Sequence, residues 1–275
     1  MAPHPHPVHP YLDAPTPLAF AHRGGAAVGD ENTAAAFARS VELGYRYVET
    51  DTHATRDGVA VVFHDPDLRR MTGDRRRIRD VTWADLASLR VNGDAAVPRL
   101  DDILAAWPQV RFNVDVKDVQ AITPTIDAVR RTGATDRVLL ASFSDARLAR
   151  MRREVGPAVA TSMGVREVAA LWARARLGRA YRVTGSSTAP GPPVGAGSVP
   201  RGVVAAQIPA RQGGVRVVTP RFVAHAHRLG LQVHVWTIDD PTEMRELLDL
   251  GVDGIMTDRI EVLREVYETR GHWTT

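Results

Sequence analysis

The chain of 275 residues contains no cysteine. It can therefore form no disulfide and offers no thiol nucleophile, and any bound metal ion must be held by oxygen or imidazole. Long hydrophobic runs are also missing, since no apolar stretch approaches the ~18 residues of a membrane-spanning helix. The first residues lack the basic stretch and apolar core of a secretory signal. These absences predict a soluble, cytoplasmic protein.

Lysine is nearly absent as well. Lys117 is the only lysine, and the other 34 of the 35 basic residues are arginine. The 32 acidic residues almost balance them, which leaves a net charge of +3 with histidine neutral. A nearly balanced chain gives little reason to expect a nucleic-acid partner. The exceptional lysine, by contrast, calls for an explanation.

Strand-length apolar runs alternate with helical patterns along most of the chain, which is typical of parallel β/α units. We expect eight strands, at 18–22, 46–51, 111–117, 138–142, 158–162, 203–207, 231–236 and 252–256. Helical patterns occupy 32–43, 119–131, 144–154, 166–177, 220–229, 241–250 and 260–269. The predicted fold class is α/β, a (β/α)8 TIM barrel over residues 18–270. A doubly wound open sheet is the competing fold, but no glycine-rich dinucleotide turn follows the first strand.

Three segments depart from this alternation. Residues 1–17 are predicted to form a flexible N-terminal tail. A hairpin signal at Asp57-Gly58 leads into an arginine-rich insertion after the second strand, at about 66–100. Residues 184–202 are so rich in glycine, proline and serine that we expect a flexible loop. A lid over the site and a plain tolerated insertion explain that loop equally well.

Acidic residues cluster on one face of two predicted strands. Strand alternation places Glu49 and Asp51 on one face of the second strand, and Asp115 and Lys117 on one face of the third. Their apolar opposite faces suit the helix layer, so the charged faces should point into the barrel. Three converging carboxylates repel one another unless a cation lies among them, and hard oxygen ligands suit Mg²⁺ or Ca²⁺. The alternative is that each acid forms a separate salt bridge.

Two histidines flank this acidic cluster. His22 ends the first strand, and His64 follows the hairpin. Two imidazoles at one site can deprotonate a nucleophile and protonate a leaving group, because imidazole titrates near neutral pH. The pair is therefore a candidate for acid/base catalysis, although a histidine at a strand end can also be purely structural.

Several short motifs occur in a characteristic order along the chain. They are HRG at 22–24, ENT at 31–33, ETD at 49–51, TRDG at 55–58, HDPDLRRMTG from His64, NVDVK at 113–117, VHVWTID at 233–239 and GVDGIMTD at 251–258. Together they resemble the motifs of the glycerophosphodiester phosphodiesterase family. The resemblance is weak between about 160 and 215.

This resemblance implies a (β/α)8 barrel that hydrolyses small-molecule glycerophosphodiesters with one divalent cation, Mg²⁺ or Ca²⁺. Matched residue by residue, it makes His22 and His64 the acid/base pair, Arg23 and Lys117 phosphate contacts, Glu49, Asp51 and Asp115 metal ligands, and Trp236 an aromatic wall beside the alcohol. Asp115 stands where family members commonly have glutamate. Because aspartate is one methylene shorter, direct binding of the cation, binding through water and a weaker site all remain open.

Two other functions remain as alternatives. One is a phospholipase D acting on lysophospholipids or sphingomyelin-type substrates, and the other is a non-catalytic protein that binds anionic lipid or phosphate. Residues 69–79 carry six arginines and one aspartate, which could support transient contact with an anionic membrane surface. A solvated insertion explains the same segment more simply. The sequence does not indicate the oligomeric state.

Overall fold

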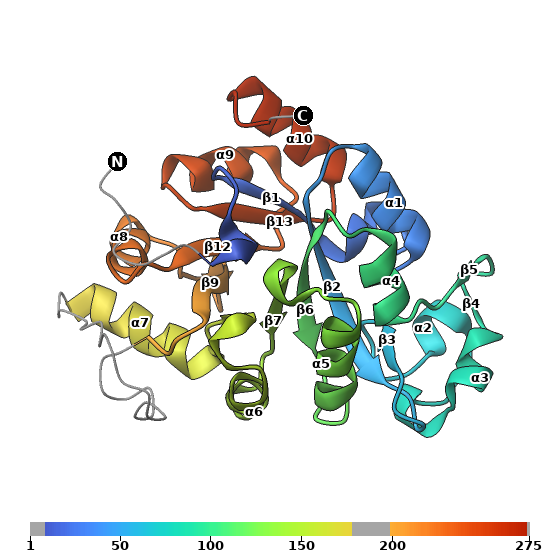
Figure 1. The fold of residues 1–275 in the computed structure, drawn as a ribbon. Coiled ribbons are helices and arrows are strands. Elements are labelled where there is room, and N and C mark those ends of the chain that lie inside the picture. Colours follow the sequence, from blue (N-terminus) through green and yellow to red (C-terminus); the bar gives the residue numbers. More distant parts are fainter. Residues whose placement is uncertain (1–8, 178–198, 274–275) are drawn as a thin grey trace.

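The computed structural model describes residues 9–177 and 199–273. Its centre is a closed barrel of parallel strands (Figure 1). The eight barrel strands are β1 (Leu18–Ala21), β2 (Tyr47–Ala54), β6 (Arg111–Val116), β7 (Val138–Ala141), β8 (Ala160–Ser162), β9 (Val203–Pro209), β12 (Gln232–Trp236) and β13 (Gly254–Thr257). Strand β1 pairs with both β2 and β13, and this double pairing closes the barrel. The predicted TIM barrel is confirmed, with all eight strands close to their expected positions.

Helices form a ring outside the barrel (Figure 1). They are α1 (Ala34–Glu42), α4 (Leu100–Ala106), α5 (Ile122–Arg131), α6 (Asp145–Val155), α7 (Val165–Leu177), α8 (Pro220–Arg228), α9 (Pro241–Asp249) and α10 (Ile260–Thr269). Helix α4 was not predicted, because its short apolar pattern follows directly on the insertion. The first helix begins later than predicted: Thr33 is its N-cap and accepts a hydrogen bond from the Ala36 amide.

The strands separate two apolar layers, as their alternating side chains require. Phe20, Tyr47 and Met256 belong to a cluster inside the barrel. Val48 and Phe112 point the other way, into the larger core that the helices cover. This alternation confirms that the polar faces of β2 and β6 turn inward.

A short N-terminal segment closes one end of the barrel. The 3-10 helix at Pro10–Leu12 places the fully buried Tyr11 ring edge-on against Tyr47, with the ring centroids 5.5 Å apart. The Tyr47 hydroxyl donates a hydrogen bond to the Tyr11 carbonyl oxygen at 2.8 Å. Because Tyr47 is the first residue of β2, this is the end of the barrel where the strands begin. The prediction of a flexible tail up to residue 17 was therefore wrong for Tyr11 and Leu12, whose side chains are buried inside the barrel.

The insertion after the second strand is a compact unit with its own core. It includes β3 (Ala60–Val62), which pairs antiparallel with β2, then α2 (Arg69–Thr72), α3 (Trp83–Ala87), β4 (Arg90–Val91) and β5 (Ala95–Ala96). Leu68, Ile78 and Leu86 are fully buried in it. Figure 1 shows this unit projecting from the barrel beside α4.

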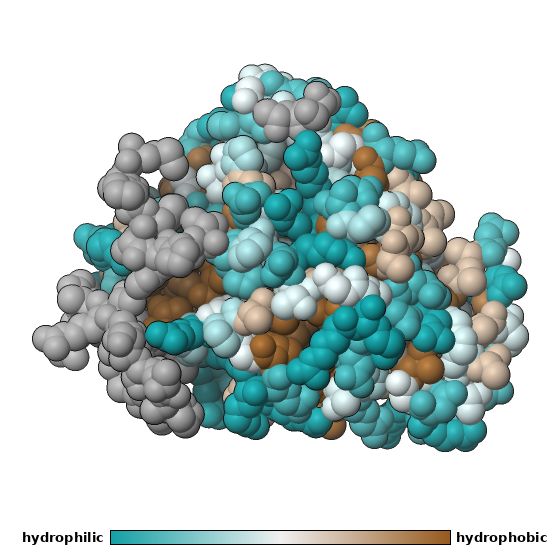
Figure 2. Space-filling model, viewed as in Figure 1, coloured by the Kyte–Doolittle hydropathy of each residue, from teal (hydrophilic) through white to brown (hydrophobic). Residues whose placement is uncertain are grey.

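Residues 184–198 of the predicted flexible loop lie outside the described part of the chain. On the face seen in Figure 2, hydrophobic residues appear only as separated areas among hydrophilic ones. In the described ranges, no helix is both long enough and apolar enough to cross a bilayer.

Candidate active site

A cavity of about 770 Å³ opens where the barrel strands end. In a (β/α)8 barrel, this C-terminal end of the strands is where loops carry the chemistry. All eight residues that the sequence singled out line this cavity: His22, Arg23, Glu49, Asp51, His64, Asp115, Lys117 and Trp236. The structure thus brings the predicted residues together, while their individual roles stay predictions.

The backbone conformation of the turn after β1 explains why the HRG motif ends in glycine. Arg23 has a φ of 51° and Gly24 a φ of 83°. A Cβ atom on Gly24 would lie 2.7 Å from a ring carbon of Phe37, so only glycine fits there. This turn aims the Arg23 amide at a Glu49 carboxylate oxygen, 3.2 Å away.

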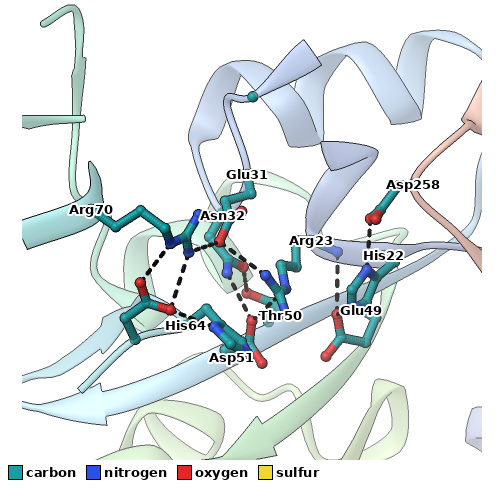
Figure 3. Close-up of polar contacts among 12 residues, drawn as sticks. His22, Arg23, Glu31, Asn32, Glu49, Thr50, Asp51, His64, Arg70 and Asp258 are labelled. Carbon is teal, nitrogen blue, oxygen red and sulfur yellow. Dashed lines mark hydrogen bonds and ion pairs between the residues drawn. The ribbon is translucent and has the colours of Figure 1, made fainter. Parts of the chain in front are cut away.

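His22 is held between two carboxylates. Its Nδ1 lies 2.7 Å from Asp258 Oδ1, and its Nε2 lies 3.7 Å from Glu49 Oε2 (Figure 3). Because a carboxylate only accepts hydrogen bonds, Nδ1 carries a proton and Nε2 faces the acidic cluster. Burial opposes the charged ring, but Glu49 and Asp258 outweigh it and raise the pKa of His22 above its usual value.

His64 is oriented in the same way by its sequence neighbour. Its Nδ1 lies 2.7 Å from Asp65 Oδ1, and Arg70 of α2 donates to the other Asp65 oxygen at 2.6 Å. Arg70 also donates to Glu31 at 2.6 Å, which ties the insertion to the turn after β1 (Figure 3). Despite the opposing effect of burial, Arg70 and His64 lower the pKa of Asp65 to about 2.

The acidic cluster follows from the pairing of β2 with β6. Their register places Asp51 beside Asp115 and Glu49 beside Asn113. Lys117 follows β6 directly, and its Nζ lies 2.7 Å from Asp51 Oδ1 and 2.7 Å from Asp115 Oδ2. The single lysine therefore bridges two buried carboxylates.

Glu49, Asp51 and Asp115 differ in how strongly neighbouring cations stabilise their charged forms. Burial raises the pKa of Glu49 to about 7, and the neighbouring Asp51 adds to this effect. Burial also raises the pKa of Asp115, in spite of Lys117. Burial acts in the same direction on Asp51, but Lys117 and Arg23 together lower its pKa. The difference arises because the Arg23 side chain, 3.2 Å from Asp51, gives that residue a second cation.

Four supporting residues were not assigned these roles from the sequence: Glu31, Asn32, Asp65 and Asp258. The buried Asn32 donates to Asp51 Oδ2 at 2.9 Å, and Arg23 donates to Glu31 at 3.0 Å. The sequence marks ENT at 31–33 only as one of the motifs that carry the family resemblance, and assigns its residues no role in the site. The signal that could have revealed Asp258 is its place directly after the last barrel strand.

The donor chemistry fits a hard divalent cation, although no cage for an ion is preformed. Asp115 Oδ1 and Asn113 Oδ1 are buried and have no hydrogen-bond partner among the residues that the structure describes. Carboxylate and amide oxygens are typical Mg²⁺ and Ca²⁺ ligands. Across 9–177 and 199–273, however, no three His, Asp or Glu side chains converge closely enough to hold an ion. Lys117 lies between Asp51 and Asp115 instead.

Two aromatic rings, those of Phe143 and Trp236, also line the cavity. Phe143 and Trp236 pack edge to face with their centroids 5.5 Å apart. The Lys117 ammonium lies 5.8 Å from the centre of the Phe143 ring. Trp236 thus lines the same cavity, while its contact with the alcohol stays a prediction.

Comparisons with known proteins agree on one family. A model of the glycerophosphoryl diester phosphodiesterase family matches residues 22–262. A protein from Mycobacterium tuberculosis, named probable glycerophosphodiester phosphodiesterase 2, is 40% identical over 259 residues, which cover 93% of this chain and 92% of that protein.

Solved structures share the fold. A putative glycerophosphoryl diester phosphodiesterase from Silicibacter pomeroyi aligns with a TM-score of 0.75 and 25% identity, covering 95% of this chain and 97% of that one. An Oleispira antarctica phosphodiesterase, solved in complex with the product sn-glycerol-3-phosphate, has a TM-score of 0.74 and 20% identity over 92% of this chain and 97% of its own. The second likeness concerns the fold alone.

Proposed function

Because the chain belongs to the glycerophosphoryl diester phosphodiesterase family, we propose that it hydrolyses glycerophosphodiesters to glycerol 3-phosphate and an alcohol in the cavity at the strand ends. One observation carries this proposal. His22 and His64 are each held through Nδ1 by a carboxylate of their own. They share the cavity with the positively charged side chains of Arg23 and Lys117 and with the acidic cluster. The product named in the Oleispira antarctica structure fits the same reaction.

The histidines account for the proton transfers of the reaction. Water, or a neighbouring hydroxyl of the substrate, adds to phosphorus as the bond from phosphorus to the alcohol oxygen breaks; in the second route water then opens the cyclic phosphate. One imidazole takes a proton from the attacking oxygen, and the other gives a proton to the departing alkoxide. Asp258 and Asp65 keep the Nδ1 proton in place, so that the Nε2 atoms of His22 and His64 do this work.

Arg23 and Lys117 supply positive charge for the phosphate. Both side chains are held by carboxylates within the cavity wall, Arg23 by Glu31 and Lys117 by Asp51 and Asp115. The negative charge of a bound phosphodiester would interact with these same two side chains. Because both already lie in the cavity wall, the chain need not rearrange to provide this contact. Positive charge already in place also stabilises the charge that develops in the transition state.

We further propose that Glu49, Asp51 and Asp115 would hold one divalent cation, Mg²⁺ or Ca²⁺. The unpartnered Asp115 oxygen and the weakly neutralised Glu49 support this assignment. When bound, the ion polarises a phosphate oxygen and offsets the charge of the acids. The reach of Asp115, one methylene shorter than glutamate, stays a prediction.

Transient contact with an anionic membrane surface through 69–79 remains a weaker proposal. Three of the arginines in this segment are already paired: Arg70 with Glu31 and Asp65, Arg76 with Asp74, and Arg79 with Asp80. The segment therefore offers less charge to a membrane than its composition suggests.

A coupled assay of glycerol 3-phosphate release tests the proposed reaction. We expect release from glycerophosphocholine and glycerophosphoethanolamine, loss of that release after chelation, and recovery when Mg²⁺ or Ca²⁺ is added back. No release from any diester under any metal condition would refute hydrolysis. Unchanged release after complete chelation would refute the metal proposal alone.

A further inference from the structure

The charged groups of the candidate site occupy only one side of the cavity. They come from β1, β2 and β6, from the turns that follow these strands, and from the insertion. Gln207, a residue of β9, lines the same cavity. Around the barrel, β7 and β8 separate β9 from β6, and β12 and β13 separate it from β1. Gln207 therefore faces the charged groups across the cavity.

The strand register sets the depth of Gln207 in the barrel. β9 pairs with β12 so that Gln207 lies beside His234, and Pro209 lies beside Trp236. Because a strand rises about 3.3 Å per residue, Gln207 lies about 7 Å closer to the start of its strand than Pro209 does. The position of Gln207 is thus deeper in the barrel than that of Trp236.

Two hydrogen bonds determine which way the Gln207 amide points. His234 Nε2 lies 2.9 Å from Gln232 Oε1, an atom that can only accept, so Nε2 carries the ring proton. The other ring nitrogen, Nδ1, is then the acceptor, and it lies 3.4 Å from Gln207 Nε2. Within 9–177 and 199–273, Gln207 Oε1 has no hydrogen-bond partner. This carbonyl oxygen and the second N–H of the amide are therefore left for a ligand in the cavity.

His234 is held firmly enough to orient that amide. Its ring is fully buried, with its centroid 4.8 Å from that of Phe20. A Cβ atom on Gly254 would lie 3.0 Å from His234 Cδ2 and 2.8 Å from a ring carbon of Phe20, so a glycine at this position makes room for both rings. Burial lowers the pKa of His234 to about 4 against the opposing charge of Asp253. The ring is neutral at neutral pH, and Nδ1 stays an acceptor.

The exposed edge of the Gln207 amide is complementary to a hydroxyl group. A hydroxyl both donates and accepts, and the edge offers one acceptor and one donor. In glycerophosphocholine, the glycerol carries two hydroxyls, whereas the trimethylammonium of choline has no group that can donate or accept a hydrogen bond. The terminal hydroxyl is the one farther from phosphorus, so it is better placed to reach the opposite side of the cavity.

We propose that Gln207, oriented by His234, binds the terminal hydroxyl of the glycerol and makes the enzyme selective for diesters that carry it. This inference rests on the proposed function. With the phosphate beside Arg23 and Lys117, the glycerol extends across the cavity to Gln207, and the alcohol lies nearer the mouth beside Trp236. An analogue without the hydroxyl leaves the amide without its partner, which is how a polar site rejects such a substrate. His234 touches no substrate and is a positioning residue.

The test compares glycerophosphocholine with its terminal deoxy analogue, in which hydrogen replaces the hydroxyl farthest from phosphorus. The analogue keeps the hydroxyl next to the phosphate ester, so attack by water and attack by that hydroxyl both stay open. Choline release reports hydrolysis of either compound. We expect the kcat/KM of the wild-type protein to be at least about tenfold lower for the analogue. Equal values for the two substrates would overturn the proposal.

A matched pair of variants locates the selectivity. Gln207→Met keeps the length of the side chain but removes the amide, so kcat/KM should fall about tenfold for glycerophosphocholine and little for the analogue. Gln212→Met is the control, because Gln212 also lines the cavity but lies on the exposed β10 (Arg211–Gln212). It should keep the wild-type ratio between the two substrates. An equal fall for both substrates in Gln207→Met would indicate a structural role only and would overturn the proposal.

His234→Phe tests the positioning role. Phenylalanine fills the same space but cannot accept a hydrogen bond, so the Gln207 amide is free to turn. The ratio of kcat/KM for glycerophosphocholine to that for the analogue should fall at least about threefold in the folded variant. A general loss of packing would lower both values and leave the ratio unchanged, and that result would contradict the role of His234.

The two proposals fail in different ways. If the wild-type protein releases no choline from glycerophosphocholine under any metal condition, the proposed function itself is wrong. If it releases choline from glycerophosphocholine and from the deoxy analogue with the same kcat/KM, only the assignment of Gln207 is wrong.

Discussion

Lys117 neutralises two buried carboxylates with one compact charge. Its Nζ is equally close to Asp51 and Asp115, at 2.7 Å each, and the two acids lie side by side on neighbouring strands. These acids raise the pKa of Lys117, although burial acts against its charge. A chain that otherwise uses arginine throughout thus keeps lysine where a small, rotatable ammonium fits between two oxygens.

Lys117→Arg should therefore impair catalysis despite conserving charge. The wide planar guanidinium cannot occupy the point between both acids, so we expect kcat/KM to fall by about 100-fold. Arg153→Lys, on an exposed face of α6, is the reciprocal control and should change it less than about twofold. Equal activity of the two variants in the glycerol 3-phosphate assay would remove any special role for the lysine.

His234 shows the opposite situation, a buried histidine whose ring hydrogen-bonds to the neutral side chains of Gln207 and Gln232. It is fully buried, with Nε2 2.9 Å from Gln232 Oε1 and its ring centroid 4.8 Å from that of Phe20. Burial lowers its pKa to about 4, although the negative charge of Asp253 acts in the opposite direction. The neutral ring donates through Nε2 and leaves Nδ1 to accept from Gln207, so the charged form is disfavoured.

This burial predicts a specific pH dependence of stability. The pKa of His234 is about 6.5 in the unfolded chain and about 4 in the folded protein. Between these two pH values, His234 is therefore mostly protonated in the unfolded state and mostly neutral in the folded state. The free energy of unfolding should therefore fall by about 2 kcal/mol from this group between pH 7 and pH 5. Urea unfolding of His234→Gln should lack this part of the loss, while the exposed His272→Gln should retain it. Identical pH slopes in both variants would contradict the assignment.

At the scale of secondary-structure elements, the insertion supplies contacts that hold residues of the candidate active site. Through Arg70 it holds both Asp65, the partner of His64, and Glu31, the partner of Arg23. His53 adds a contact from β2 at 3.1 Å to the His64 carbonyl oxygen. The position of His64 therefore depends on contacts from β2 and from the insertion.

Arg70→Ala should loosen His64 without unfolding the barrel. We expect kcat to fall about tenfold with little change in KM, as is usual when a side chain that orients a catalytic group is lost. Arg76→Ala is the matched control, because Arg76 lies in the same insertion and pairs only with Asp74 among the described ion pairs. A loss of kcat as large in Arg76→Ala would indicate general damage to the insertion instead.

The N-terminal 3-10 helix is a second element with an unexpected role. Tyr11→Ala removes a fully buried ring from the interior of the barrel. We expect the free energy of unfolding to fall by about 4 kcal/mol, as for other large aromatic truncations. In the same denaturant titration, Val28→Ala at a 70% exposed position should change it by less than about 0.5 kcal/mol. A Tyr11→Ala protein as stable as wild type would restore the flexible-tail interpretation.

At the scale of the whole molecule, local sequence patterns correctly predicted which side chains of each strand point into the barrel, because that depends only on strand alternation. The inward faces of β2 and β6, and hence Glu49, Asp51, Asp115 and Lys117, follow from a period of two residues. Contacts across long sequence separations did not follow: Asp258 reaches His22 over 236 residues, and Arg70 reaches Glu31 over 39. Tyr11 was missed because a single aromatic in a proline-rich segment gives no periodic signal.

The account places the proposed chemistry in one cavity at the strand ends, lined by the histidines, the acidic cluster, Arg23 and Lys117. Its central claim is that His22 and His64 carry the chemistry. The most direct measurement is the rate of glycerol 3-phosphate release from glycerophosphocholine by His22→Ala and by His64→Ala, with His272→Ala as control. The account predicts that each of the first two falls at least about 100-fold while the control stays unchanged. Release at the wild-type rate by either site variant would contradict it.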